Sequence, residues 1–164
     1  MMKNLLEFLN KINDKIGFIS SFLILFLILL VSLSVILRYV FSVGFIWLQD
    51  LYIWTHAIFI LLGISYTLKV DEHVRIDLLY RSFSNKKKKI VNFLGIIVFG
   101  IPLTYLLLIN GWDYFLRSFN LNESSKESGG LPNVFILKFF IFFLGFLLFL
   151  EVLRQILNFF KKND

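Results

Sequence analysis

A polar stripe runs along the second long apolar segment of the chain, which extends from Trp47 to Leu68. It combines an amide, a phenol, an imidazole, a bare backbone position and a hydroxyl: Gln49, Tyr52, His56, Gly63 and Thr67. At about 100° per residue, these positions fall within an arc of about 60° on one helix face. Polar groups at membrane depth need partners, and glycine permits a second helix to approach closely. The stripe therefore predicts contact with protein, either the other spans or another subunit.

His56 is the deepest residue of this stripe that could titrate or coordinate a ligand. A proton relay would need a chain of titratable neighbours, but Tyr52 lies one turn outward and Ile60 one turn inward. A haem site would need a second buried histidine, and His73 falls beyond the span. An interhelical hydrogen bond is therefore the preferred interpretation of His56, and a proton or ligand site is the alternative.

The charged segment 71–77, DEHVRID, contains carboxylates and an imidazole, which are common metal ligands. It also contains Arg75 and follows Lys69, so a solvated or partner-facing ionic network is preferred over a metal site. The chain has no cysteine, no phosphate-binding glycine loop and no nucleophile suitably spaced from a base. The stretch Gly129–Pro132 is expected to be a turn before a helix. The sequence therefore predicts neither catalysis nor a cofactor or metal site in this chain.

The composition is that of an integral membrane protein. Of 164 residues, 58% are hydrophobic and 21 are Phe, whereas a soluble domain is roughly 45–50% apolar. The mean hydropathy is +0.79. The net charge of +6 is explained by basic residues that flank membrane spans, and it does not predict nucleic-acid binding.

The apolar runs predict an all-α fold with four transmembrane helices, at about residues 16–37, 47–68, 90–112 and 133–153, within a single domain of residues 1–164. A bend is expected near Pro102 in the third span. Residues 2–15 form an amphipathic helix, which either lies in the membrane interface or simply extends the first span. Between spans 2 and 3, a stripe ending at Phe83 predicts a short cytoplasmic surface helix, although the segment also alternates like a strand.

The basic residues also predict the topology. Thirteen Lys and Arg residues lie at the two termini and in the second loop, and four lie on the other side of the membrane. The positive-inside rule therefore places both termini in the cytoplasm of a multi-pass protein.

Four short motifs resemble the small membrane subunit, of the DctQ type, of tripartite ATP-independent periplasmic (TRAP) transporters. They occur in the expected order across nearly the whole chain: Arg38-Tyr39-Val40-Phe41, Trp47-Leu48-Gln49-Asp50-Leu51, Glu72-His73-Val74-Arg75-Ile76-Asp77, and Gly129-Gly130-Leu131-Pro132 followed by Lys138. Each motif alone is weak, but the ordered set on a four-span chain is specific. The sequence departs from the pattern at Gln49-Asp50, where many members carry two glutamates.

The resemblance implies a scaffold role in a sodium-coupled importer of organic anions such as carboxylates, in a bacterial inner membrane. Its partners would be a large membrane subunit, which holds the sodium and substrate sites, and a periplasmic substrate-binding protein. The alternatives are a small membrane adaptor or assembly factor unrelated to transport, and an integral subunit of a redox complex. The expected subunit-interface or helix-packing residues are Arg38, Trp47, Gln49, Asp50, Tyr52, His56, Gly63, Thr67, His73, Arg75 and Asp77. The expected residues for docking of the binding protein are Glu123, Glu127, Gly129, Gly130 and Pro132.

Overall fold

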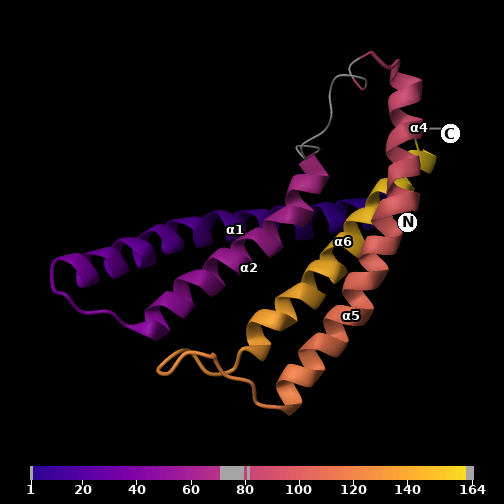
Figure 1. The fold of residues 1–164 in the computed structure, drawn as a ribbon. Helices are drawn as coiled ribbons and strands as arrows, with labels where there is room; N and C mark the ends of the chain where they lie inside the picture. Colours follow the sequence, from indigo (N-terminus) through magenta and orange to yellow (C-terminus); the bar gives the residue numbers. More distant parts are fainter. Residues whose placement is uncertain (1, 71–79, 81, 162–164) are drawn as a thin grey trace.

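The computed structural model describes residues 2–70, 80 and 82–161, and every regular element among them is helical. The elements are α1 (Met2–Tyr39), α2 (Ile46–Val70), α4 (Asn85–Gly95), the π-helical turn η1 (Ile96–Gly100), α5 (Ile101–Asn120) and α6 (Phe135–Lys161) (Figure 1). Four helical stretches are long and apolar enough to cross a membrane: Leu5–Tyr39, Ile46–Val70, Asn85–Asn120 and Phe135–Phe160. The expected all-α, four-span fold is confirmed. The segment predicted as a short surface helix falls mostly outside the described residues.

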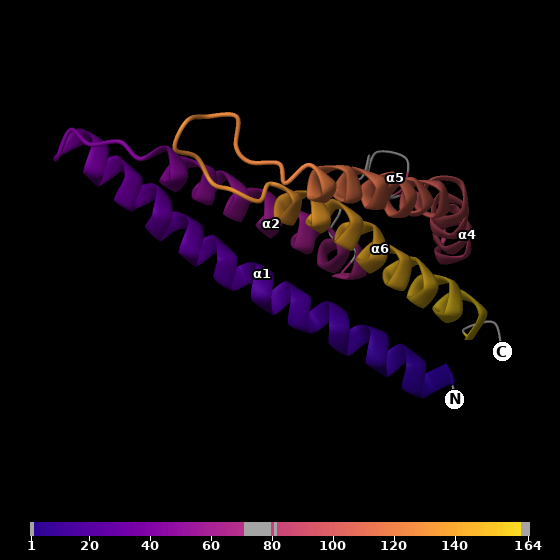
Figure 2. The same cartoon turned by 90° about the horizontal axis from the view of Figure 1, so that it is seen from below.

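Helix α6 occupies the centre of the arrangement and contacts α1, α2 and α5 (Figure 2). Helix α1 also packs along α2. The start of α1 and the end of α6 lie at one end of the helices, called the inner end below (Figures 1 and 2). The opposite end, called the outer end, carries the connections 40–45 and 121–134 (Figure 1).

Helix α1 is uninterrupted over 38 residues, so residues 2–15 form its beginning and not a separate helix. Its buried positions recur every three or four residues: Leu6, Leu9, Asn13, Gly17 and Ser20. This spacing forms a seam that packs on neighbouring helices, whereas the apolar side chains of Leu5 and Phe8 are exposed. Of the two interpretations of this segment, the structure shows the extension of the first span.

Small residues allow α1 and α2 to pack closely. Gly17 lies against the ring of Tyr66, which leaves no room for a Cβ atom at that position. On α2, Gly63 faces Ser20, whose hydroxyl donates to the carbonyl oxygen of Phe59 at 3.1 Å. Such contacts are typical of helices that associate in lipid, where close packing replaces the hydrophobic effect between helices.

Helices α5 and α6 form the second close pair. A Cβ atom on Gly111 would lie 3.0 Å from the backbone of Phe142, and one on Gly145 would lie 3.0 Å from the backbone of Leu108. Toward the outer end, the rings of Phe115 and Phe119 contact that of Phe135. The glycines bring the backbones together, and the aromatic rings fill the space beyond them.

Pro102 is accommodated by a π-helical turn within the long helix from Asn85 to Asn120. The backbone N–H of Ile101 donates to the carbonyl oxygen of Ile96, five residues earlier. A proline ring has no N–H and crowds the preceding turn of an α-helix, and a locally wider turn relieves this crowding. On the inner side of this turn, Phe93 stacks on Phe159 of α6 with 4.1 Å between ring centres.

Candidate functional site: polar clusters at the two ends of the helices

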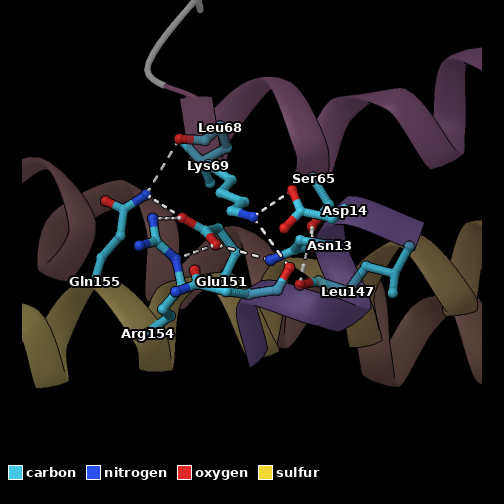
Figure 3. Close-up of polar contacts among 10 residues, drawn as sticks. Asn13, Asp14, Ser65, Leu68, Lys69, Leu147, Glu151, Arg154 and Gln155 are labelled. Atoms are coloured by element: carbon cyan, nitrogen blue, oxygen red, sulfur yellow. Dashed lines mark hydrogen bonds and ion pairs between the residues drawn. The ribbon is translucent and has the colours of Figure 1, made fainter. Parts of the chain in front are cut away.

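A fully buried carboxylate, Glu151, is the centre of a polar cluster at the inner end (Figure 3). Its Oε2 atom accepts from Asn13 Nδ2 at 2.9 Å and from Arg154 Nε at 2.8 Å. Its Oε1 atom accepts from Arg154 Nη2 at 2.6 Å and from Gln155 Nε2 at 2.8 Å. A buried carboxylate is tolerated only when it is paired and hydrogen-bonded, and both requirements are met here.

The same cluster extends to α2 through Ser65, which is completely buried. The Ser65 hydroxyl lies 3.0 Å from Asn13 Oδ1 and 3.2 Å from the carbonyl oxygen of Leu147. Asn13 of α1 therefore contacts α2 through its amide oxygen and α6 through its amide nitrogen (Figure 3). Three helices that are distant in sequence are fixed to one another by a single amide side chain.

An ion pair beside this cluster joins α1 and α2 again. Lys69 Nζ lies 2.5 Å from Asp14 Oδ1 and donates to the carbonyl oxygen of Asn10 at 3.0 Å (Figure 3). The Lys69 side chain is 14% exposed, whereas that of Asp14 is 61% exposed. The pair thus lies at the rim of the cluster, between the buried carboxylate and the solvent or headgroup layer.

A second polar cluster at the outer end joins the connection 121–134 to α5 and α6. Lys138 Nζ of α6 lies 2.5 Å from Glu123 Oε2 and 4.0 Å from the ring centre of Tyr114. The hydrogen bond from Lys138 holds the pKa of Glu123 below its ordinary value of 4.5. Lys138 therefore extends toward the outer end and pairs with a carboxylate of its own chain.

The connection 121–134 is folded on itself and attached to α2. Asp50 Oδ2 accepts from the backbone N–H of Leu131 at 2.8 Å, and Ser125 N–H donates to the Leu131 carbonyl oxygen at 2.9 Å. Gly130 lies against the Asp50 carboxylate, where a Cβ atom would collide with it. Gly129 has a φ of 82°, which favours glycine. Asp50 and two glycines therefore fix the shape of the outer surface.

The residues of the predicted α2 stripe lie in different environments. Gly63 and Thr67 belong to the inner half, where Gly63 faces α1 and the Thr67 hydroxyl donates to the Gly63 carbonyl oxygen at 2.6 Å. Gln49 and Tyr52 are half-buried, and His56 is exposed on the surface of the chain. The fully buried residues of α2 are on other positions: Leu48, Thr55, Leu62 and Ser65.

Two further interface candidates are exposed at the outer end, Arg38 at the end of α1 and Trp47 at the start of α2. Among the docking candidates, Glu127 and Pro132 are exposed, whereas Glu123 is engaged by Lys138. His73, Arg75 and Asp77 lie outside the described residues.

Asn13 and Ser65 were not among the predicted site residues, although they connect the inner cluster. Asn13 carried a usable signal, because it stands between Leu9 and Ile16 on an apolar helix face. Ser65 carried none, since a serine in a transmembrane helix can satisfy its hydroxyl on its own backbone.

The model of a protein family, the DctQ component of tripartite ATP-independent periplasmic transporters, matches residues 27–162. Comparisons with curated proteins and with solved structures give no match. The family match covers most of the chain: the outer part of the first helix that could span a membrane, and the other three such helices in full. The chain therefore belongs to the DctQ family, the small membrane subunits of TRAP transporters.

Proposed function

We propose that this chain is the scaffold subunit of a sodium-coupled importer of organic anions such as carboxylates. Its partners are a large membrane subunit, which contains the sodium and substrate sites, and a periplasmic substrate-binding protein. The complex resides in the bacterial inner membrane, and both termini of this chain face the cytoplasm. The 13-to-4 distribution of basic residues supports this orientation, as does the position of the start of α1 and the end of α6 at one end of the helices (Figure 2).

The observation that carries the proposal is the state of Glu151, the one charged residue that is fully buried in the described part of the chain. A carboxylate that couples an ion or a substrate must be able to exchange its partners during transport. Glu151 instead has both oxygens occupied by donors from α1 and α6 of the same chain. This arrangement suits a rigid support, and the transport path is then assigned to the large subunit.

His56 supplies a contact for that large subunit. It is exposed on α2, while Gly63, two turns further along, already packs on α1. An imidazole on a lipid-facing surface would be left without partners, whereas a helix of a second subunit can provide one. We assign His56 and the exposed Trp47 to this interface.

The connection 121–134 supplies a surface for the binding protein. Its shape is held by the hydrogen bond between Asp50 and the Leu131 backbone N–H, and by the Glu123–Lys138 ion pair. Glu127 and Pro132 remain exposed on it, so a charged and an apolar group are available to an incoming protein. A preformed surface of this kind lowers the ordering cost of an encounter.

The test is reconstitution of defined components in liposomes. The small and large subunits are copurified and reconstituted. Uptake of labelled carboxylates is then measured with the binding protein added to the solution outside the liposomes. We expect uptake that requires both membrane subunits, the binding protein and an inward sodium gradient. Liposomes with the large subunit alone are the control for the scaffold. Uptake by liposomes that contain this chain alone would overturn the proposal. Uptake that persists when choline replaces the external sodium would overturn sodium coupling.

A further inference from the structure

A polar notch lies between the outer ends of α1 and α2, next to the connection 40–45. Two adjoining hollows of about 380 Å³ and about 170 Å³ share Ser34, Arg38 and Gln49 in their walls. Tyr52 completes the smaller hollow. All four side chains can donate hydrogen bonds, and neither hollow is lined by an aspartate or a glutamate. The notch is therefore built for an anion.

Arg38 is the charged group of the notch, and its charge is not paired with a carboxylate among the described residues. It lies in the last turn of α1, where the helix dipole favours a cation but leaves the guanidinium donors free. The planar guanidinium matches the oxygens of a phosphate or carboxylate in a two-bond geometry. An exposed Arg38 at the membrane boundary thus offers an unused anion-binding group.

The surroundings of the notch distinguish between sources of such an anion. Tyr39 is 79% exposed, as expected for an aromatic side chain in the headgroup layer. On the membrane side, the smaller hollow is lined by Val31 and Val35, which are 39% and 48% exposed. A polar group above an exposed apolar wall is the arrangement of a phospholipid, with its phosphate above its acyl chains.

We propose that this notch binds the phosphodiester group of a phospholipid in the outer leaflet. Arg38 pairs with the phosphate, Ser34, Gln49 and Tyr52 donate hydrogen bonds around it, and one acyl chain lies along Val31 and Val35. The lipid closes the splayed outer ends of α1 and α2, which have no other polar bridge between them in the described structure.

The proposal is tested by native mass spectrometry of the full chain in detergent, titrated with dioleoylphosphatidylglycerol. We expect Arg38→Gln to weaken binding of the first lipid about tenfold, because one charge-assisted contact is lost. Arg38→Lys keeps the charge but loses the two-bond geometry, and we expect an intermediate loss. Lys126→Gln is the matched control, because it removes a cation at the same end of the molecule from an exposed position outside the notch. It should bind lipid like the parent chain.

Two further measurements separate the sources of the anion. Inorganic phosphate should not displace the lipid, and displacement by phosphate alone would overturn the assignment to a lipid. The large subunit should copurify with Arg38→Gln as it does with the parent chain. Loss of copurification with unchanged lipid binding would show that Arg38 pairs with a protein carboxylate, and would overturn the proposal. If Arg38→Gln fails to fold, the comparison uses Arg38→Lys. Equal lipid binding by Arg38→Lys and the parent chain would then overturn the proposal.

Discussion

Removal of the Glu151 carboxylate tests whether the inner cluster holds the helices together. In Glu151→Ala, the Asn13 and Gln155 amides lose an acceptor, and the Arg154 guanidinium loses its counter-ion. The Arg154 side chain is only 13% exposed, so water reaches it poorly and its charge stays uncompensated. The substitution therefore removes an attraction and also leaves buried donors unsatisfied.

The expected loss of stability follows from the contacts. Of the four bonds of Glu151, only the one from Asn13 joins two helices, and interhelical hydrogen bonds in membrane proteins average about 0.6 kcal/mol. Breaking a buried ion pair from one side costs about 3–5 kcal/mol in soluble proteins. Because Arg154 would be left uncompensated, we expect Glu151→Ala to lower the free energy of unfolding by about 3–5 kcal/mol.

The measurement is reversible unfolding of the purified chain in mixed micelles of mild detergent and dodecyl sulfate, followed by tryptophan fluorescence. Glu151→Gln keeps one acceptor oxygen and should lose about 1–2 kcal/mol. The double variant Glu151→Leu/Arg154→Leu removes both charges, and its stability should lie above that of Glu151→Ala. Glu127→Ala, an exposed carboxylate at the outer end, is the matched control and should leave stability unchanged.

Two results would refute this reasoning. Stability of Glu151→Ala within about 0.5 kcal/mol of the parent chain, the usual range for surface substitutions, would show that the cluster does not hold the helices. A double variant as unstable as Glu151→Ala would show that the uncompensated Arg154 charge is not a source of the loss.

Three further predictions concern topology, pH and the second helix. Single cysteines at Ser128 and Asn85, both exposed, should be labelled from opposite sides of intact inner membrane, and labelling of both from the periplasm would contradict the topology. The lowered pKa of Glu123 means that its pairing with Lys138 stabilises the outer connection above about pH 4.5 and is lost as the pH falls through the lowered pKa. Limited proteolysis with pepsin should show this loss, and Glu123→Gln should abolish the pH dependence. His56→Gln keeps hydrogen bonding without a titratable proton, so assembly and uptake should stay near the parent level. Normal assembly with lost uptake would instead make His56 a proton or coupling residue.

The four spans could be predicted from the sequence because long uncharged runs leave the chain no other way to satisfy its backbone. In the sequence, the charges of Glu151 and Arg154 also mark the inner end of the fourth span. The outward reach of Lys138 followed from its place near the end of a helix. Each of these features depends on neighbours within a few residues of the chain.

The contacts between distant segments could not be predicted in this way. Asn13 reaches Glu151 across 138 positions, and Asp50 reaches the Leu131 amide across 81. Periodicity gives the face of each helix but not the rotation and height at which two helices meet. The α2 stripe illustrates this limit, because residues within one arc of about 60° lie against α1 at one end and on the surface at the other.

The π-helical turn Ile96–Gly100 makes this segment tolerant of a change in length. It contains one residue more than an α-helical path would need, so the extra residue is absorbed within the turn. Deleting one residue here would leave an α-helical path, in which α4 and α5 keep about their present rotation. Phe93 would then still face Phe159, and Asn92 the Tyr80 hydroxyl that lies 3.1 Å from its Oδ1 atom. A deletion in the regular part of the helix would instead turn every side chain beyond it by about 100°.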